Sequence, residues 1–166
     1  MNAADPAYML DTTEFNRVLK EKVSTSSFTG YRLMVTGIQA DELRATPDSK
    51  RRTDLLAIFE EINPSTELAS SAAWGIEGAG WGQAYWNDGS GKFEKMLQRL
   101  QQLDPKSKDP RNQLRDILIA ETAIKNDAIL VSGDDNLRKV VSEFGGQTID
   151  RFRFECGDTA INAPAD

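Results

Sequence analysis

Histidine is absent from all 166 residues of this chain. Its absence excludes Ser-His-Asp and Cys-His hydrolases, and every zinc site that uses histidine. The one cysteine, Cys156, cannot form an intramolecular disulfide, which suits a reducing cytoplasm. No apolar run approaches the roughly 20 residues that cross a bilayer, and the polar start MNAADPAYM lacks signal-peptide character. We therefore expect a cytoplasmic protein without membrane contact, whose chemistry would rest on carboxylates, lysine, tyrosine or hydroxyl groups.

Positive charge is also in short supply. The formal net charge is −6, the wrong sign for a general nucleic-acid binder. A local basic patch remains compatible with that total, and so does a cluster of carboxylates. The hydrophobic content of 39% and the charged content of 28% are ordinary for a globular protein. At this length the chain fits one domain with a real core.

Short apolar segments alternate with amphipathic ones along the chain. Strands are predicted at 7–10, 31–36, 128–132 and 147–149, and the segments between them carry apolar residues at helical spacing. Asp48 or Ser49 is expected to cap the helix that ends before Pro64. Alternating strands and helices predict a parallel sheet with helices on both faces, an α/β/α sandwich. We expect this domain to span 1–150, followed by a tail at 151–166.

One segment, about 74–91, breaks this alternation. It holds half of the 12 glycines and all three tryptophans, without a clean period. We interpret it as an insertion. Trp74, Trp81, Tyr85 and Trp86 could stack on bases, but packing or a protein interface is the more common use of such residues.

Four acidic residues from distant segments are predicted to meet. Asp11 and Asp134 each follow a predicted strand, and sites in parallel sheets form beyond the carboxyl ends of strands. Asp116 interrupts an apolar stretch of a helix, and Glu42 lies in the short helix after the second strand. Crowded carboxylates repel one another, and a divalent cation such as Mg²⁺ or Mn²⁺ removes that penalty.

Neighbouring polar residues could support such a site. Thr12 and Ser132 offer hydroxyl groups, and Asn112 shares a helix face with Asp116. The adjacent pair Asp134–Asp135 by itself would be explained by a turn. In the company of the other acids, we assign Asp134 to the site and expect Asp135 to cap the following helix.

The order of these motifs resembles the PIN-domain nucleases, notably the VapC-like toxins of bacterial toxin–antitoxin pairs. The matching stretches are MLDTTEF, DEL, NQLRDILIAETA and LVSGDDNL. The last has the family's pattern of Ser132, Asp134 and Asn136 after a strand. The resemblance covers roughly 7–150 and implies a parallel α/β sandwich that cleaves RNA with Mg²⁺ or Mn²⁺. It also implies a small antitoxin partner and a homodimer.

Two groups of basic residues could contact RNA phosphates. One is Lys50, Arg51 and Arg52, and the other is Lys106, Lys108, Arg111 and Arg115. A solvated helix face explains them equally well.

Two other functions remain open. A DTT motif after one strand and SGDDN after another are similar to haloacid-dehalogenase-like phosphatases, which use an aspartate nucleophile. Those enzymes usually carry a second acid where this chain has Thr13, and they need a lysine. The second alternative is a PIN-fold protein that binds RNA without cleaving it.

Overall fold

A single five-stranded sheet forms the centre of the protein. The computed structural model describes residues 5–69, 89–106 and 109–153. All strands are parallel, in the order β3-β2-β1-β4-β5. Their bounds are β1 Ala7–Leu10, β2 Arg32–Thr36, β3 Ser65–Glu67, β4 Ala128–Val131 and β5 Gln147–Ile149.

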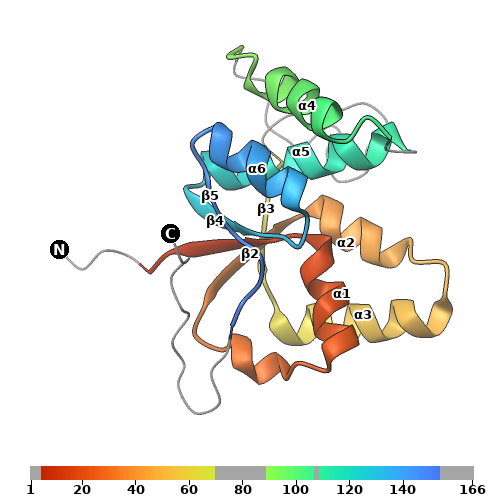
Figure 1. Cartoon of the computed structure of the whole chain (residues 1–166). Coiled ribbons are helices and arrows are strands. Elements are labelled where there is room, and N and C mark those ends of the chain that lie inside the picture. The colour runs from red at the N-terminus through yellow and green to blue at the C-terminus, as the bar shows by residue number, and fades with distance from the viewer. Residues whose placement is uncertain (1–4, 70–88, 107–108, 154–166) are drawn as a thin grey trace.

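Helices cover both faces of this sheet, as the sequence predicted (Figure 1). On one face lie α1 and α3, and on the other α5 and α6, with α4 packed outside them. The helices are α1 Thr12–Glu21, α2 Gly37–Arg44, α3 Ser49–Ile62, α4 Lys92–Leu103, α5 Pro110–Lys125 and α6 Asp135–Glu143, with a 3₁₀ turn at Thr25–Phe28. The prediction of a parallel α/β/α sandwich is therefore confirmed.

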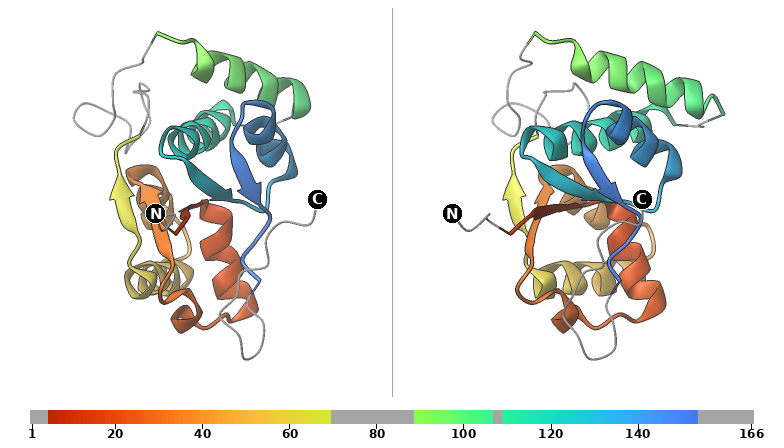
Figure 2. Two further views of the ribbon diagram at one scale, coloured as in Figure 1. Left: turned by 90° about the vertical axis from the view of Figure 1, so that its left-hand side faces the viewer. Right: turned by 60° about the vertical axis from the view of Figure 1, so that its left-hand side comes forward.

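Two apolar cores lie on opposite faces of the sheet, and strand β1 contributes side chains to both. Ala7 and Met9 pack with α4, α5 and α6, whereas Tyr8 and Leu10 pack with α1 and α3. Successive side chains of a strand point to opposite faces. Because both faces are covered, this strand has no polar residue over its whole length. Figure 2 shows the two helical layers on either side of the strands.

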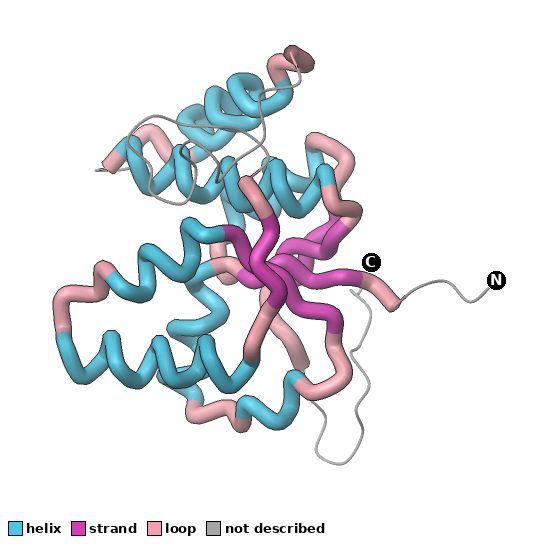
Figure 3. Tube along the Cα trace, turned by 180° about the vertical axis from the view of Figure 1, so that it is seen from behind, coloured by secondary structure: helices cyan, strands magenta, loops and turns pink. Residues whose placement is uncertain are grey.

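The order of the strands in the sheet changes direction between β1 and β4. Strands β2 and β3 lie on one side of β1, and β4 and β5 lie on the other. The crevice outside the carboxyl ends of β1 and β4 is thus the topological switch point, where α/β sheets bind ligands. Figure 3 shows the strands from behind, running together between the helices.

Three features differ from the sequence-based expectation. Strand β3 (Ser65–Glu67) was not predicted, because it is a three-residue edge strand with no apolar residue. The polar segment STSSFTG (24–30), for which its composition predicts a loop, contains the 3₁₀ turn Thr25–Phe28. Phe152 is only 2% exposed and packs among Tyr8, Phe28 and Tyr31, so the packed chain continues past residue 150.

Some predictions concern residues beyond those described. They are the insertion apart from 89–91, the tail from residue 154 and Lys108. Within the described residues, no helix is both long enough and apolar enough to cross a membrane.

Candidate active site

Asp11 is the most enclosed of the four predicted acids, with 4% of its surface exposed. It is the N-cap of α1, and its Oδ1 accepts a hydrogen bond from the Thr12 amide at 2.8 Å. Its Oδ2 accepts from the hydroxyls of Thr13 at 2.9 Å and Ser132 at 2.7 Å. The carboxylate is therefore held in one orientation at the end of β1, as an N-cap and as an acceptor from β4.

Asp134 lies beside it, one strand away. The backbone of Asp11 donates to the carbonyl of Val131 at 3.0 Å, which fixes the two strand ends together. Asp134 is the N-cap of α6, and its Oδ1 accepts from the amides of Asn136 at 2.8 Å and Leu137 at 3.1 Å. The expectation that Asp135 caps this helix is wrong. Asp135 is the first helical residue, is exposed, and pairs with Arg138.

Glu42 reaches the same place from α2. Its Oε2 accepts a hydrogen bond from the Thr12 hydroxyl, and its Oε1 lies 3.8 Å from the Arg115 guanidinium. The preceding residue, Asp41, instead pairs with Arg44 at 2.9 Å, and 27% of its side chain is exposed. The local contacts therefore distinguish the two adjacent acids, and Glu42 is the one tied to the residue after Asp11.

Asp116 enters from α5. Its carboxylate is partly buried and has no hydrogen bond or ion pair with any other described residue. Burial, and after it the charges of Asp11, Glu42 and Asp134, together raise its pKa from 3.8 to about 8, against a smaller opposing effect of Arg115. Asp116 is thus a buried acid whose charged form the other three carboxylates disfavour further.

The four acids line one pocket of about 490 Å³ at the carboxyl edge of the sheet. Burial also raises the pKa of Asp11 and of Glu42, in each case with an added contribution from a neighbouring acid. Among the described residues lining this pocket, which we call the carboxylate pocket, Arg115 is the only cation. The pocket therefore concentrates negative charge that the protein itself does not neutralise.

The donor set suits a hard divalent cation. Mg²⁺ and Mn²⁺ prefer oxygen ligands, and four carboxylates supply them without histidine or cysteine. Within the described residues, however, no three acidic side chains already stand close enough together to hold one ion. The residues fit a metal by chemistry and by unbalanced charge, and binding would require the side chains to draw together.

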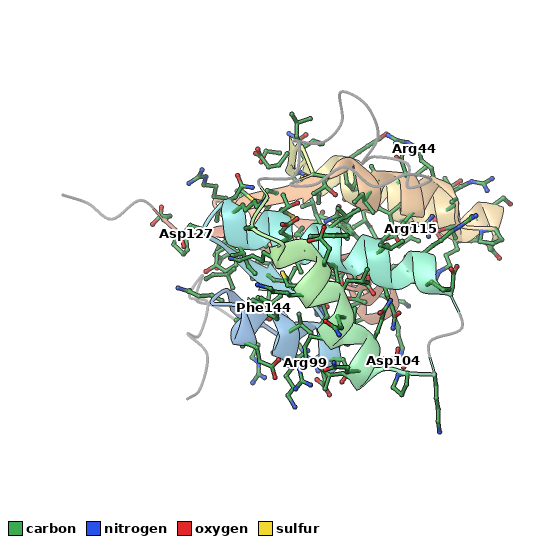
Figure 4. The ribbon with its side chains drawn as sticks, turned by 90° about the horizontal axis from the view of Figure 1, so that it is seen from above. Arg44, Arg99, Asp104, Arg115, Asp127 and Phe144 are labelled. Atoms are coloured by element: carbon green, nitrogen blue, oxygen red, sulfur yellow. The ribbon has the colours of Figure 1, made fainter. Side chains whose placement is uncertain are left out.

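The predicted phosphate-binding cations are dispersed. Arg115 lines the carboxylate pocket, and Figure 4 shows it on α5. Arg51 is exposed and donates to the Asn16 side chain, whereas Lys50 pairs with Asp54 at 2.8 Å. Arg52 donates to the carbonyl of Thr46, and the exposed Arg111 lies in the first turn of α5. Of this set, only Arg51 and Arg115 border a pocket described here.

The predicted supporting residues act in different ways. Ser132 is fully buried and links the two strand-end acids, because its hydroxyl donates to Asp11 and accepts from the Asp134 amide at 3.1 Å. Asn112 lines the pocket and accepts a hydrogen bond from Arg115 at 3.2 Å. Asn136 contributes its backbone amide to Asp134, and its side chain is not among those lining the pocket.

Sequence reasoning missed two residues that support the site. Thr13 donates to Asp11 and accepts from the Gly133 amide at 3.1 Å, which joins α1 to the loop after β4. Arg138 holds the same loop by donating to the carbonyl of Ser132 at 2.7 Å. The sequence did offer one indication of Thr13: it carries a hydroxyl group two residues after Asp11, in the first turn of the helix that Asp11 caps. Nothing local to the sequence marked Arg138.

Comparisons with known proteins add little. No protein-family model matches the chain, and no curated protein matches it. Among solved structures, it is similar to a domain of a functionally unknown protein from Methanocaldococcus jannaschii DSM 2661. The two are 13% identical with a TM-score of 0.45, and the match covers 97% of this chain and 99% of that chain. A likeness of this degree assigns no function to the chain.

Proposed function

We propose that this protein is a metal-dependent endoribonuclease. Asp11, Glu42, Asp116 and Asp134 would bind Mg²⁺ or Mn²⁺ and direct it to a phosphodiester of RNA. The observation that carries the proposal is the carboxylate pocket itself. These four acids from four elements line it together with Asp41, which pairs with Arg44, and Arg115 is the one cation among the described lining residues. Such an arrangement costs stability without a ligand, so a cation is its simplest purpose.

The bound ion would supply a nucleophilic water and neutralise charge that develops on the phosphate. The chain's own residues set the positions of its ligands. Thr13 and Ser132 fix Asp11, and the Thr12 hydroxyl fixes Glu42. Arg115 faces Glu42 across the pocket and could turn to a substrate phosphate once a metal takes over that carboxylate.

The motif order adds support from a second direction. The four acids stand in the motifs that resemble PIN-domain nucleases, and the parallel α/β/α sandwich is the fold that this resemblance implies. A role as a toxin with a small antitoxin partner, and a homodimer, stay predictions of the resemblance.

The phosphatase alternative fits the site less well. Such phosphatases usually carry a second acid two residues after the nucleophile, where this chain has Thr13, whose hydroxyl donates to Asp11 at 2.9 Å. The lysine that such phosphatases need is also missing from the described residues that line the pocket. A non-catalytic RNA-binding protein would have no use for a pocket whose acids outnumber its one cation, so we rank that alternative below a nuclease.

The decisive experiment is cleavage of end-labelled single-stranded RNAs by wild-type protein and by Asp11→Asn and Asp134→Asn. Both aspartates cap helices, and asparagine caps a helix about as well. The fold of Asp134→Asn should therefore survive. Asp11→Asn also loses the hydrogen bonds that Thr13 and Ser132 donate to Oδ2, so it should be less stable, and circular dichroism would verify that each variant is folded. We expect cleavage with Mn²⁺ or Mg²⁺, none in EDTA, and a loss of at least about a hundredfold in either variant.

Asp48→Asn is the matched control. Asp48 caps α3 through the Arg51 amide at 2.7 Å and does not line the carboxylate pocket. It makes the same chemical change at the same kind of position, so its cleavage should equal that of wild type. Full activity in EDTA, or in Asp134→Asn, would rule out the proposed chemistry.

A further inference from the structure

A second pocket, of about 480 Å³, adjoins the carboxylate pocket. Thr13 and Asn16 line both, so the two pockets are neighbours that share a wall in the first turn and a half of α1. We call the second one the α1–α6 pocket, because residues of α1, of α6 and of the loop before it form most of its wall.

Most charges in the α1–α6 pocket cancel within it. Each of its acidic residues pairs with an arginine of the same pocket. The pairs are Glu14 and Glu21 with Arg17, Asp135 with Arg138, and Asp150 with Arg151. The carboxylate pocket is the opposite case, since its acids outnumber its one cation.

Two cations of the α1–α6 pocket are left over. Neither Lys20 nor Arg51 has an ion pair with a described residue, and both are exposed. Arg51 projects from α3 to the side chain of Asn16, which in turn donates to the Thr12 carbonyl at 3.0 Å. Arg51 thus stands at the boundary between the two pockets. Lys20 lies one helical turn beyond Asn16 along α1.

We infer that the α1–α6 pocket binds the backbone of single-stranded RNA next to the phosphate that is cleaved, with Arg51 and Lys20 contacting successive phosphates. The inference rests on the proposed nuclease function. Its basis is the wall that the two pockets share at Thr13 and Asn16, together with their opposite charge balance. A phosphate in the carboxylate pocket needs a metal, whereas the neighbouring phosphates meet cations that are already present.

Binding of RNA in EDTA tests this directly. Each phosphate contact to a single strand contributes about 0.7 to the slope of log affinity against log salt, which corresponds to roughly fivefold at about 0.1 M salt. The variant Lys20→Ala/Arg51→Ala should therefore bind a fluorescein-labelled oligoribonucleotide roughly 25-fold more weakly, with a slope reduced by about 1.4. Because both side chains are exposed, the melting temperature should not change.

The control removes one lysine and one arginine elsewhere. Lys139 is exposed on α6, and Arg32 is exposed at the amino end of β2, opposite to the sheet edge that holds the site. Lys139→Ala/Arg32→Ala changes net charge by the same amount, so its affinity and salt slope should stay close to those of wild type. A general charge effect would weaken both double variants equally and overturn the assignment.

RNA length gives a second readout. Wild-type affinity should rise as the oligonucleotide grows long enough to occupy both pockets, and the Lys20→Ala/Arg51→Ala variant should lose most of that gain. If wild type and this variant bind and cleave RNA alike, the subsite is wrong and the nuclease proposal stands. If the variant binds more weakly but no RNA is ever cleaved, the subsite holds and the nuclease proposal fails. An absence of RNA binding overturns the subsite.

Discussion

Replacing Asp116 with asparagine should stabilise the protein in EDTA while it abolishes cleavage. The substitution removes the charge that the other three acids repel, and it breaks no hydrogen bond between described residues. Asparagine has almost the same shape as the protonated acid, so packing on α5 should be preserved. Stability and activity are therefore expected to change in opposite directions, as at many functional sites.

The magnitude follows from the pKa. Folded Asp116 has a pKa of about 8 against an ordinary value of 3.8, so between these values the folded protein binds more protons than the unfolded chain. The free energy of unfolding then falls as pH rises through this window. One pKa unit corresponds to about 1.4 kcal/mol, which gives an upper limit of roughly 6 kcal/mol above the folded pKa. The carboxylate keeps some contact with solvent. We therefore expect the free energy of unfolding of Asp116→Asn to exceed that of wild type by about half of this limit.

The assay is urea unfolding followed by far-ultraviolet circular dichroism, in EDTA, at several pH values. The stability difference between Asp116→Asn and wild type should be small near pH 4 and should grow by up to about 1.4 kcal/mol per pH unit toward pH 8. Adding Mn²⁺ should stabilise wild type much more than the variant. Glu60→Gln, which removes an exposed acid of α3, serves as the control and should show no such pH trend.

A difference that does not vary with pH would refute the argument that burial and the neighbouring acids raise the pKa of Asp116. A variant less stable than wild type at neutral pH would refute it as well. If Mn²⁺ stabilises neither protein, the carboxylate pocket does not bind that ion.

Three further substitutions test the parts that hold the site. Ser132→Ala removes the 2.7 Å hydrogen bond to Asp11 and should cost about 1–3 kcal/mol in urea unfolding, with the pH profile of cleavage shifted upward. Gly146→Ala places a Cβ 2.6 Å from Val141 Cγ1, so it should destabilise by about 1–3 kcal/mol yet leave the cleavage rate of the folded protein unchanged. Phe152→Ala should cost about 3–5 kcal/mol, whereas a dispensable tail would leave the melting temperature as it is.

The secondary structure could be predicted from the sequence wherever buried residues give a regular spacing of apolar side chains along the chain. The run at β1 and the helical spacing of α4 and α6 both mark residues that pack on a core. Strand β3 was not predicted, because an edge strand of three polar residues has no such spacing of apolar side chains. The burial of Phe152 was missed for a related reason: its partners Tyr8 and Phe28 lie more than a hundred residues away along the chain.

The candidate site, too, could be predicted only in part. Four acids after strands or within helices could be selected from the sequence, because the carboxyl ends of parallel strands share one edge. The sequence order of Asp134 and Asp135 could not tell which one caps α6. That depends on where the first helical turn closes, and hydrogen bonds to the amides of Asn136 and Leu137 decide it.

What the sequence by itself determined was the alternation of strands and helices, and with it the edge at which the acids gather. Only the tertiary structure decided how their charges balance. Arg115 faces Glu42, Thr13 and Ser132 hold Asp11, and Asp116 is left without a partner among the described residues. These contacts join segments up to 121 residues apart. The energy of a buried charge depends on its neighbours in space, so spacing along the chain could not supply it.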